Sequence, residues 1–352
     1  MNNAIFILTD IPIEVSRLHI CTWDLYGEGA IEIGLEFRPN SVSEAGKINK
    51  VEFILSLPFI NLGDEVSCLA QALVGENSAN SKFVFNDTVK TTHIIKEEPA
   101  NGSVVEFRHR DSLAILPVYD IKKEDGQLVF SVNNVDVLDS EICNSKTSAY
   151  VRILIKTKMD NFVVKHRGIT KTSYLYDIKI NEMRNVPDRI NRYLNQGKSI
   201  CEKVVACFCL HVVPSNYHIS YVDSSKLINI RILESAAFNR YLPIIHSSDN
   251  EYIILFLKDK MSETESRGTY SFFSSFEKER IGDEQIIISI VVNLLCSLFI
   301  GIAAINNSVN INTWYESWEV WVVMSALISL ILYLTIPWSK IWHHILRWKR
   351  TW

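Results

Sequence analysis

The feature that most constrains this chain is a strongly apolar run without formal charge over residues 286–305. An α-helix rises about 1.5 Å per residue, so such a run spans about 30 Å, the hydrocarbon thickness of a bilayer. A second apolar run covers residues 320–336, and tryptophan and tyrosine residues flank it as they do at membrane interfaces. The sequence therefore predicts a transmembrane helical hairpin over residues 286–337.

Charged residues around the two runs predict an orientation. The connecting segment, residues 306–319, contains no lysine or arginine, whereas basic residues precede the first run and follow the second. The positive-inside rule then places both termini in the cytoplasm of a multi-pass protein of the cell inner membrane. Residues 338–352 combine tryptophan with basic residues, which is typical of an interfacial tail on the lipid bilayer.

Small and polar residues interrupt both apolar runs at four-residue intervals, so that they form one row along each helix. The residues are Ser289, Asn293, Ser297 and Gly301 in the first run and Ser325 and Ser329 in the second. Such rows allow helices to pack closely. They indicate either the internal packing of the hairpin or a homo-oligomer whose helices line a pore.

The rest of the chain is predicted to be β-rich. Residues 30–37 alternate strictly, with Glu32 and Glu36 on the face opposite the apolar residues, as in a half-buried strand. Similar short strands, including residues 82–85, extend through a domain at residues 1–180, and an α+β continuation with a helix near 186–197 follows at residues 181–260. A polar linker at residues 261–285 completes the predicted fold class: a β-rich (α+β) cytoplasmic domain, sandwich- or barrel-like, before the C-terminal two-helix transmembrane hairpin.

Few residues suggest chemistry. Cys207, Cys209 and His211 occupy alternate positions and would share one face of a strand, but buried thiols are common in apolar segments, so core packing is expected rather than a metal site. The chain has no recognisable nucleophile with its base and no paired carboxylates. No catalytic residue, metal or cofactor is therefore predicted, and the protein is not expected to be an enzyme.

One window carries an excess of positive charge in a chain whose net charge is -4. Its candidate ligand-binding residues are Arg152, Lys156, Lys158, Lys165, His166, Arg167 and Lys171. Arginine and lysine are the usual ligands of phosphate groups. The window indicates an anionic, nucleotide-like ligand, although a solvated strand face and an anionic membrane surface are alternatives.

This layout resembles the two-span membrane effectors of bacterial antiphage systems that signal with nucleotides, of the Hailong, Panoptes and CBASS kinds. The resemblance implies antiviral defence in which a β-rich sensor domain binds a nucleotide second messenger from a partner nucleotidyltransferase and controls an ion channel or a membrane-disrupting bundle. No duplex nucleic acid is expected as a partner. The alternative is a membrane-tethered enzyme or scaffold with an unrecognised site.

Overall fold

The computed structural model describes most of the chain. The described residues are 4–25, 28–40, 48–74, 78–124, 126–168, 170–242, 251–262, 268–280, 283–306, 321–322, 324–325 and 328–329. The chain divides into two units, Met1–Lys278 and Glu279–Trp352. Unit 1 includes both of the cytoplasmic regions predicted on either side of residue 180.

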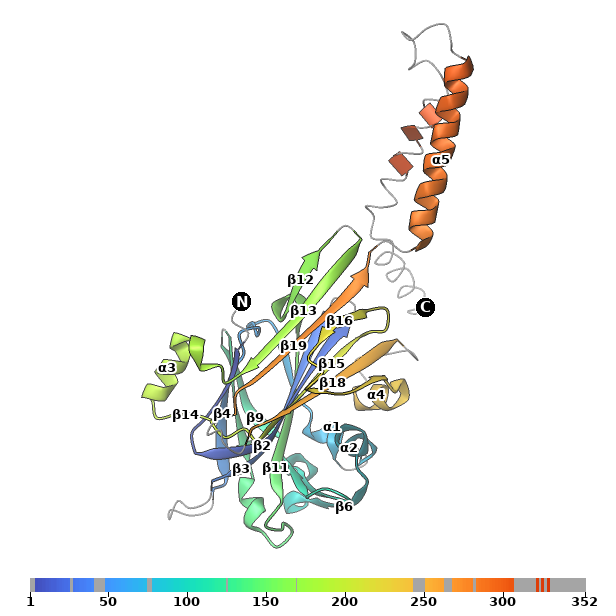
Figure 1. Ribbon diagram of the computed structural model, residues 1–352. Coiled ribbons are helices and arrows are strands. Elements are labelled where there is room, and N and C mark those ends of the chain that lie inside the picture. The colour runs from blue at the N-terminus through green and yellow to red at the C-terminus, as the bar shows by residue number, and fades with distance from the viewer. Residues whose placement is uncertain are drawn as a thin grey trace. The chain divides into compact units, whose positions relative to one another are not determined.

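Unit 1 contains two mixed β-sheets (Figure 1). In the first sheet the strand order is β16-β19-β13-β1-β4-β10-β9, with β12 beside β13 and β14 beside β1. The strands are β1 (Ala4–Thr9), β4 (Lys50–Ser56), β9 (Val118–Glu124), β10 (Gln127–Asn133), β12 (Val163–Arg167), β13 (Lys171–Ile180), β14 (Ser199–Ile200), β16 (His218–Val222) and β19 (Tyr270–Glu279).

The second sheet has the order β17-β18-β15-β2-β3-β11-β8-β7-β6, with β5 beside β11. The strands are β2 (Ile13–Leu25), β3 (Glu28–Pro39), β5 (Glu65–Cys68), β6 (Val89–Ile94), β7 (Ser103–Phe107), β8 (Leu113–Ile115), β11 (Ser148–Lys158), β15 (Ala206–Pro214), β17 (Leu227–Ile232) and β18 (Tyr252–Lys260).

The main core lies between the two sheets. Apolar residues at alternate positions of β2, β3, β4, β10, β11 and β15 meet there, and Phe53 of the first sheet packs edge-on against Phe37 of the second at 5.0 Å between ring centroids. This interleaving is that of a β-sandwich. The predicted β-rich character is confirmed, and the alternation of residues 30–37 does place Ile31, Ile33 and Leu35 in this core.

Helices cover the outer faces of both sheets. Helices α1 (Ala70–Leu73), α2 (Ser78–Phe85) and α4 (Ser235–Tyr241) pack on the second sheet, and α3 (Asp188–Asn195) packs Ile190 on the first (Figure 1). The helix predicted near 186–197 is confirmed as α3, with Gly197 at φ 83° just beyond its end. The strand predicted at 82–85 is wrong, because this segment belongs to α2 and places Phe85 against Tyr150 and Phe107. Single-turn 3₁₀ segments occur at Ile95–Glu97, Pro99–Asn101, Val135–Asp139, Met159–Asn161 and Met183–Asn185.

The segment predicted as a polar linker, residues 261–285, contains strand β19. Phe272 and Phe276 are buried in the core of unit 1, whereas Phe273 is 39% exposed. The alternation of buried and exposed rings on this strand therefore reflects the two faces of a sheet.

Unit 2 overturns the predicted transmembrane hairpin. Its helix α5 (Asp283–Asn306) includes the first predicted span, but within the described residues no helix is long and apolar enough to cross a membrane. The sequence argument counted uncharged residues in a row, and such a run does not by itself establish a helix able to cross a membrane. Of the second span, 320–336, the structure describes only separate residues, and residues 307–319 and 338–352 lie outside the described part.

Several predictions depended on that hairpin and are wrong for the same reason. They are the multi-pass location in the inner membrane, the transmembrane ion channel, and the resemblance to two-span antiphage effectors, which rested on the layout of the two spans. The α+β sandwich is the part of the predicted fold class that the structure supports.

Candidate functional site

Arg152, the first residue of the predicted ligand-binding window, is buried beneath the helices of the second sheet. Its Nε and Nη2 each lie 2.6 Å from Oε2 of Glu32, and its Nη1 donates to the Tyr150 hydroxyl at 3.0 Å. Burial disfavours its charged form, but the carboxylate of Glu32 and the surrounding phenols more than offset this and raise its pKa. Arg152 is thus committed to an internal ion pair and cannot hold an external ligand.

The rest of the predicted window is spread over unit 1 and is largely paired with acids. Lys156 lies 3.0 Å from Glu65, and Lys171 lies 2.6 Å from Glu277. Lys165 forms an ion pair with Asp160. The exposed members are Lys158, His166, Arg167 and Lys171. The window does not converge on one site, because strand alternation and the β12–β13 hairpin send its members in different directions.

The rows of small residues in unit 2 satisfy their hydroxyl groups within their own segments. Ser289 donates to the carbonyl of Gln285 at 2.7 Å, Ser297 to that of Asn293 at 2.9 Å, and Ser325 to that of Val322 at 2.8 Å. The remaining members, Asn293, Gly301 and Ser329, are exposed. A role of these rows in helix packing stays a prediction.

Cys207, Cys209 and His211 do share one face of β15, as the sequence predicts, and that face is in the core. Nδ1 of His211 lies 2.7 Å from the Thr22 hydroxyl, and its Nε2 lies 3.6 Å from the thiol of Cys209. Burial raises the pKa of both thiols and lowers the pKa of His211 to about 3. Over the described ranges no group of three histidine, cysteine or acidic side chains is placed to hold a metal ion.

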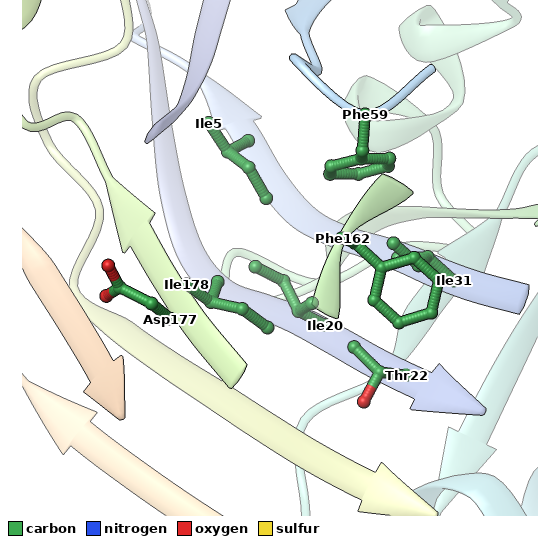
Figure 2. A pocket seen from close by; sticks show the side chains of 8 residues that line it. All are labelled: Ile5, Ile20, Thr22, Ile31, Phe59, Phe162, Asp177 and Ile178. Carbon is green, nitrogen blue, oxygen red and sulfur yellow. The ribbon is translucent and has the colours of Figure 1, made fainter. Parts of the chain in front are cut away.

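A small cavity lies between the two sheets (Figure 2). It offers ≈ 10 Å³, which is about the room of one water molecule. Its lining residues are Ile5, Ile20, Thr22, Ile31, Phe59, Phe162, Asp177 and Ile178. Figure 2 shows apolar side chains around it and the Asp177 carboxylate directed away from them. The cavity is too small and too apolar to serve as a ligand site.

A different group of residues converges on the outer face of the second sheet, beside the part that the helices cover. Arg17 and His19 on β2, Phe208 on β15, and Lys258 and Lys260 on β18 lie on this face, because His19 is opposite Phe208 and Phe208 is opposite Lys258. Arg110, from the segment between β7 and β8, joins them through Glu36, which it meets at 2.7 Å and which lies 3.7 Å from Arg17. We call these six residues the basic–aromatic patch.

The patch holds an excess of positive charge. Arg17 and Arg110 share the carboxylate of Glu36. With Lys258 and Lys260, the patch has four cations against this one carboxylate, which leaves four minus one, or three positive charges. Burial lowers the pKa of Lys258, and the like charges of Lys260 and Arg17 lower it further. Within the part of the chain that the structure describes, Lys258 and Lys260 form no ion pair. An anion placed among these groups would relieve their mutual repulsion.

Aromatic rings form the floor of the patch. The Phe208 ring packs edge-on against His19 at 5.1 Å and stacks on Phe256 at 6.0 Å between centroids, and Nζ of Lys258 lies 5.1 Å from the Phe208 centroid. Phe208 is half-buried, so its ring is held in place while part of its surface remains accessible. Cations beside a fixed ring suit a ligand that has both negative charge and a flat, aromatic part.

The hydrogen bonds around His19 favour one of its tautomers. Arginine only donates, so the Tyr150 hydroxyl accepts from Arg152 and can give its own proton to Nδ1 of His19, which lies 3.2 Å away. Burial, and then the charges of Arg152, Arg110 and Arg17, lower the pKa of His19 well below its usual value. His19 is therefore neutral at pH 7, and the tautomer with its proton on Nε2 is the one in which Nδ1 accepts from the Tyr150 hydroxyl.

Sequence reasoning missed the patch because its members are far apart in the chain. Arg17, Arg110 and Lys258 belong to three separate segments, and only the pairing of β2 with β15 and of β15 with β18 brings two of them together. The one available signal was the placement of Phe256, Lys258 and Lys260 at alternate positions of the sequence. No protein-family model matches this chain, and no curated protein matches it.

Proposed function

We propose that unit 1 is a binding module for a phosphorylated ligand of the nucleotide class, and that the basic–aromatic patch is its site. Arg17, Lys258 and Lys260 would neutralise the phosphate groups, since guanidinium and ammonium groups are the usual partners of phosphate. Phe208 would support the base, as aromatic rings do for bases of any sequence. The observation that carries the proposal is the convergence of Arg17, Lys258 and Lys260 on one face of the sheet beside the fixed ring of Phe208.

The module is proposed to bind without turnover. Arginine and lysine side chains in the patch can hold and neutralise an anion, but the patch contains no hydroxyl, thiol or free carboxylate to act as a nucleophile. Nδ1 of His19 is occupied by the Tyr150 hydroxyl, which removes its basic nitrogen from proton transfer.

The site also differs from the window predicted from sequence, and this difference provides a matched control. Lys258→Glu reverses a charge in the patch, whereas Arg167→Glu reverses a charge at an exposed position of the β12–β13 hairpin. Both variants change the net charge of the chain equally. A loss of affinity that depends on position therefore distinguishes a built site from general electrostatic attraction.

Calorimetric titration of the full chain with ATP and with pyrophosphate tests the proposal. Lys258→Glu and Arg17→Glu are expected to weaken ATP binding about tenfold or more, since a hydrogen bond to a charged group contributes about 1.5–3 kcal/mol. Arg167→Glu should change it little. Phe208→Leu should weaken ATP binding more than pyrophosphate binding, because only ATP has a base to stack. The proposed site would be contradicted if Lys258→Glu and Arg167→Glu lost equal affinity for ATP, or if neither lost any.

A further inference from the structure

Strand β17 is the terminal strand of the second sheet among the described elements, and it leaves apolar side chains uncovered. Ile228, Ile230 and Ile232 are 56%, 44% and 54% exposed. One side of the strand pairs with β18, while the backbone groups on its other side meet no strand of the described chain. Edge strands with exposed apolar residues are templates for pairing with another strand.

Two of the exposed isoleucines, Ile230 and Ile232, lie on the core side of their sheet. Ile230 is opposite Leu255 and Ile232 is opposite Ile253, and Leu255 is fully buried between the sheets. Residues of this face are normally covered by the facing sheet. Because Ile230 and Ile232 face the same way and remain exposed, the described residues leave the sandwich open along this edge, and a further layer of apolar side chains could close it.

We propose that β17 is an interface between two copies of this chain, which pair β17 with β17 in antiparallel orientation around Ile230. This register places Ile228 of one copy, at the irregularity in the pairing of β17 with β18, opposite Ile232 of the other, so apolar side chains meet across the pair. It also places Asn229 opposite Arg231, whose guanidinium can donate to the amide oxygen. The sequence LINIRI is therefore complementary to itself about one two-fold axis, as an isologous interface requires.

Neighbouring registers fit less well. Centring the pair on Arg231 would place two arginines face to face, and centring it on Asn229 would place Arg231 opposite Leu227. A shift by one residue would bring isoleucines opposite Asn229 and Arg231 and would turn one apolar face outward. The sequence of β17 therefore favours pairing with β17 of a second copy, in the register centred on Ile230.

Disulfide cross-linking of the full chain tests the register. Directly opposite residues in an antiparallel pair have Cβ atoms about 4.5–5.5 Å apart, close to the range that a disulfide spans. Ile230→Cys should give a covalent dimer on mild oxidation, above the level of the wild-type chain with its native cysteines. Asn229→Cys alone should not, but a mixture of Asn229→Cys and Arg231→Cys chains should cross-link.

Sedimentation supplies an independent readout. The wild-type chain should sediment as a dimer, and Ile230→Lys should abolish this association. Leu62→Lys, at an apolar position that is 66% exposed on another segment, should leave the dimer unchanged. Circular dichroism would verify that each variant is folded. Cross-linking of Asn229→Cys as efficient as that of Ile230→Cys, or an Ile230→Cys chain that stays uncross-linked, would overturn the proposal.

Discussion

The buried ion pair between Glu32 and Arg152 yields the sharpest prediction on stability. Glu32 is fully buried and accepts hydrogen bonds from Trp23 Nε1 at 2.8 Å and the Tyr241 hydroxyl at 2.9 Å, in addition to those from Arg152. Glu32→Gln removes the charge that compensates Arg152, which then stays buried as an unpaired cation. Breaking a buried pair in this way costs about 3–5 kcal/mol.

A cost of this size is a large part of the total stability, since a folded domain is stabilised by about 5–15 kcal/mol. Arg152→Met should cost a similar amount, because it leaves the Glu32 carboxylate without its cation. The double variant Glu32→Gln/Arg152→Met removes both charges and keeps the volume, so the two losses should not add. We expect a coupling free energy of about 2 kcal/mol or more.

Urea unfolding of the full chain, followed by far-UV circular dichroism, measures these free energies. A control at the exposed ion pair of Lys171 with Glu277, such as Glu277→Gln, should cost less than about 1 kcal/mol. Single variants of the buried pair that cost no more than this control, or losses that add within about 0.5 kcal/mol, would refute the reasoning.

Three further predictions follow from buried groups. Burial lowers the pKa of His211 to about 3, so the unfolded chain binds a proton below about pH 6.5 that the folded chain does not. Stability should therefore fall as the pH drops below that value, by about 2 kcal/mol from this residue at pH 5, and His211→Gln should flatten the dependence of the urea-unfolding free energy on pH. Gly34→Ala would place a Cβ 2.4 Å from the Tyr150 hydroxyl oxygen, so a loss of about 1–3 kcal/mol is expected in urea unfolding, and Tyr150→Phe should recover part of it. Cys207 and Cys209 are fully buried, so a thiol reagent such as Ellman's should modify them only after unfolding; rapid modification of both in the folded chain would contradict their placement.

The alternation of residues 30–37 shows how far sequence reasoning reached into the fold. The pattern identified strand β3 and assigned Ile31, Ile33 and Leu35 to the core. It also implied that Glu32 and Glu36 face solvent, whereas both are buried, Glu32 beneath α4 and Glu36 against Arg17 and Arg110. Whether the second face of a strand is covered depends on segments far away in the chain, such as α4, which supplies Tyr241 to Glu32. The periodicity of a strand shows only which of its two faces is the more apolar, and not whether the other face is covered.

Charge patterns had the same limit for the site. A cluster of basic residues in sequence is a cluster in space only if the backbone keeps them on one face, and Arg152 and Lys165 are instead drawn to separate acidic partners. Conversely, Lys258 and Arg17 come together only because β15 lies between their strands. The apolar run in unit 2 was identified correctly as a helix, but its length in sequence did not determine what the helix can span.

The order of strands has a consequence for how this chain reaches its native state. β1 and β2 lie in the interior of different sheets, and their partners include β13 and β15, which begin at Lys171 and Ala206. Contacts between such distant segments slow folding, because a long loop must close before the pairs form. During synthesis, one edge of β2 therefore has no partner until β15 leaves the ribosome, and a chain cut short before Ala206 would keep this apolar edge open to other unfinished chains.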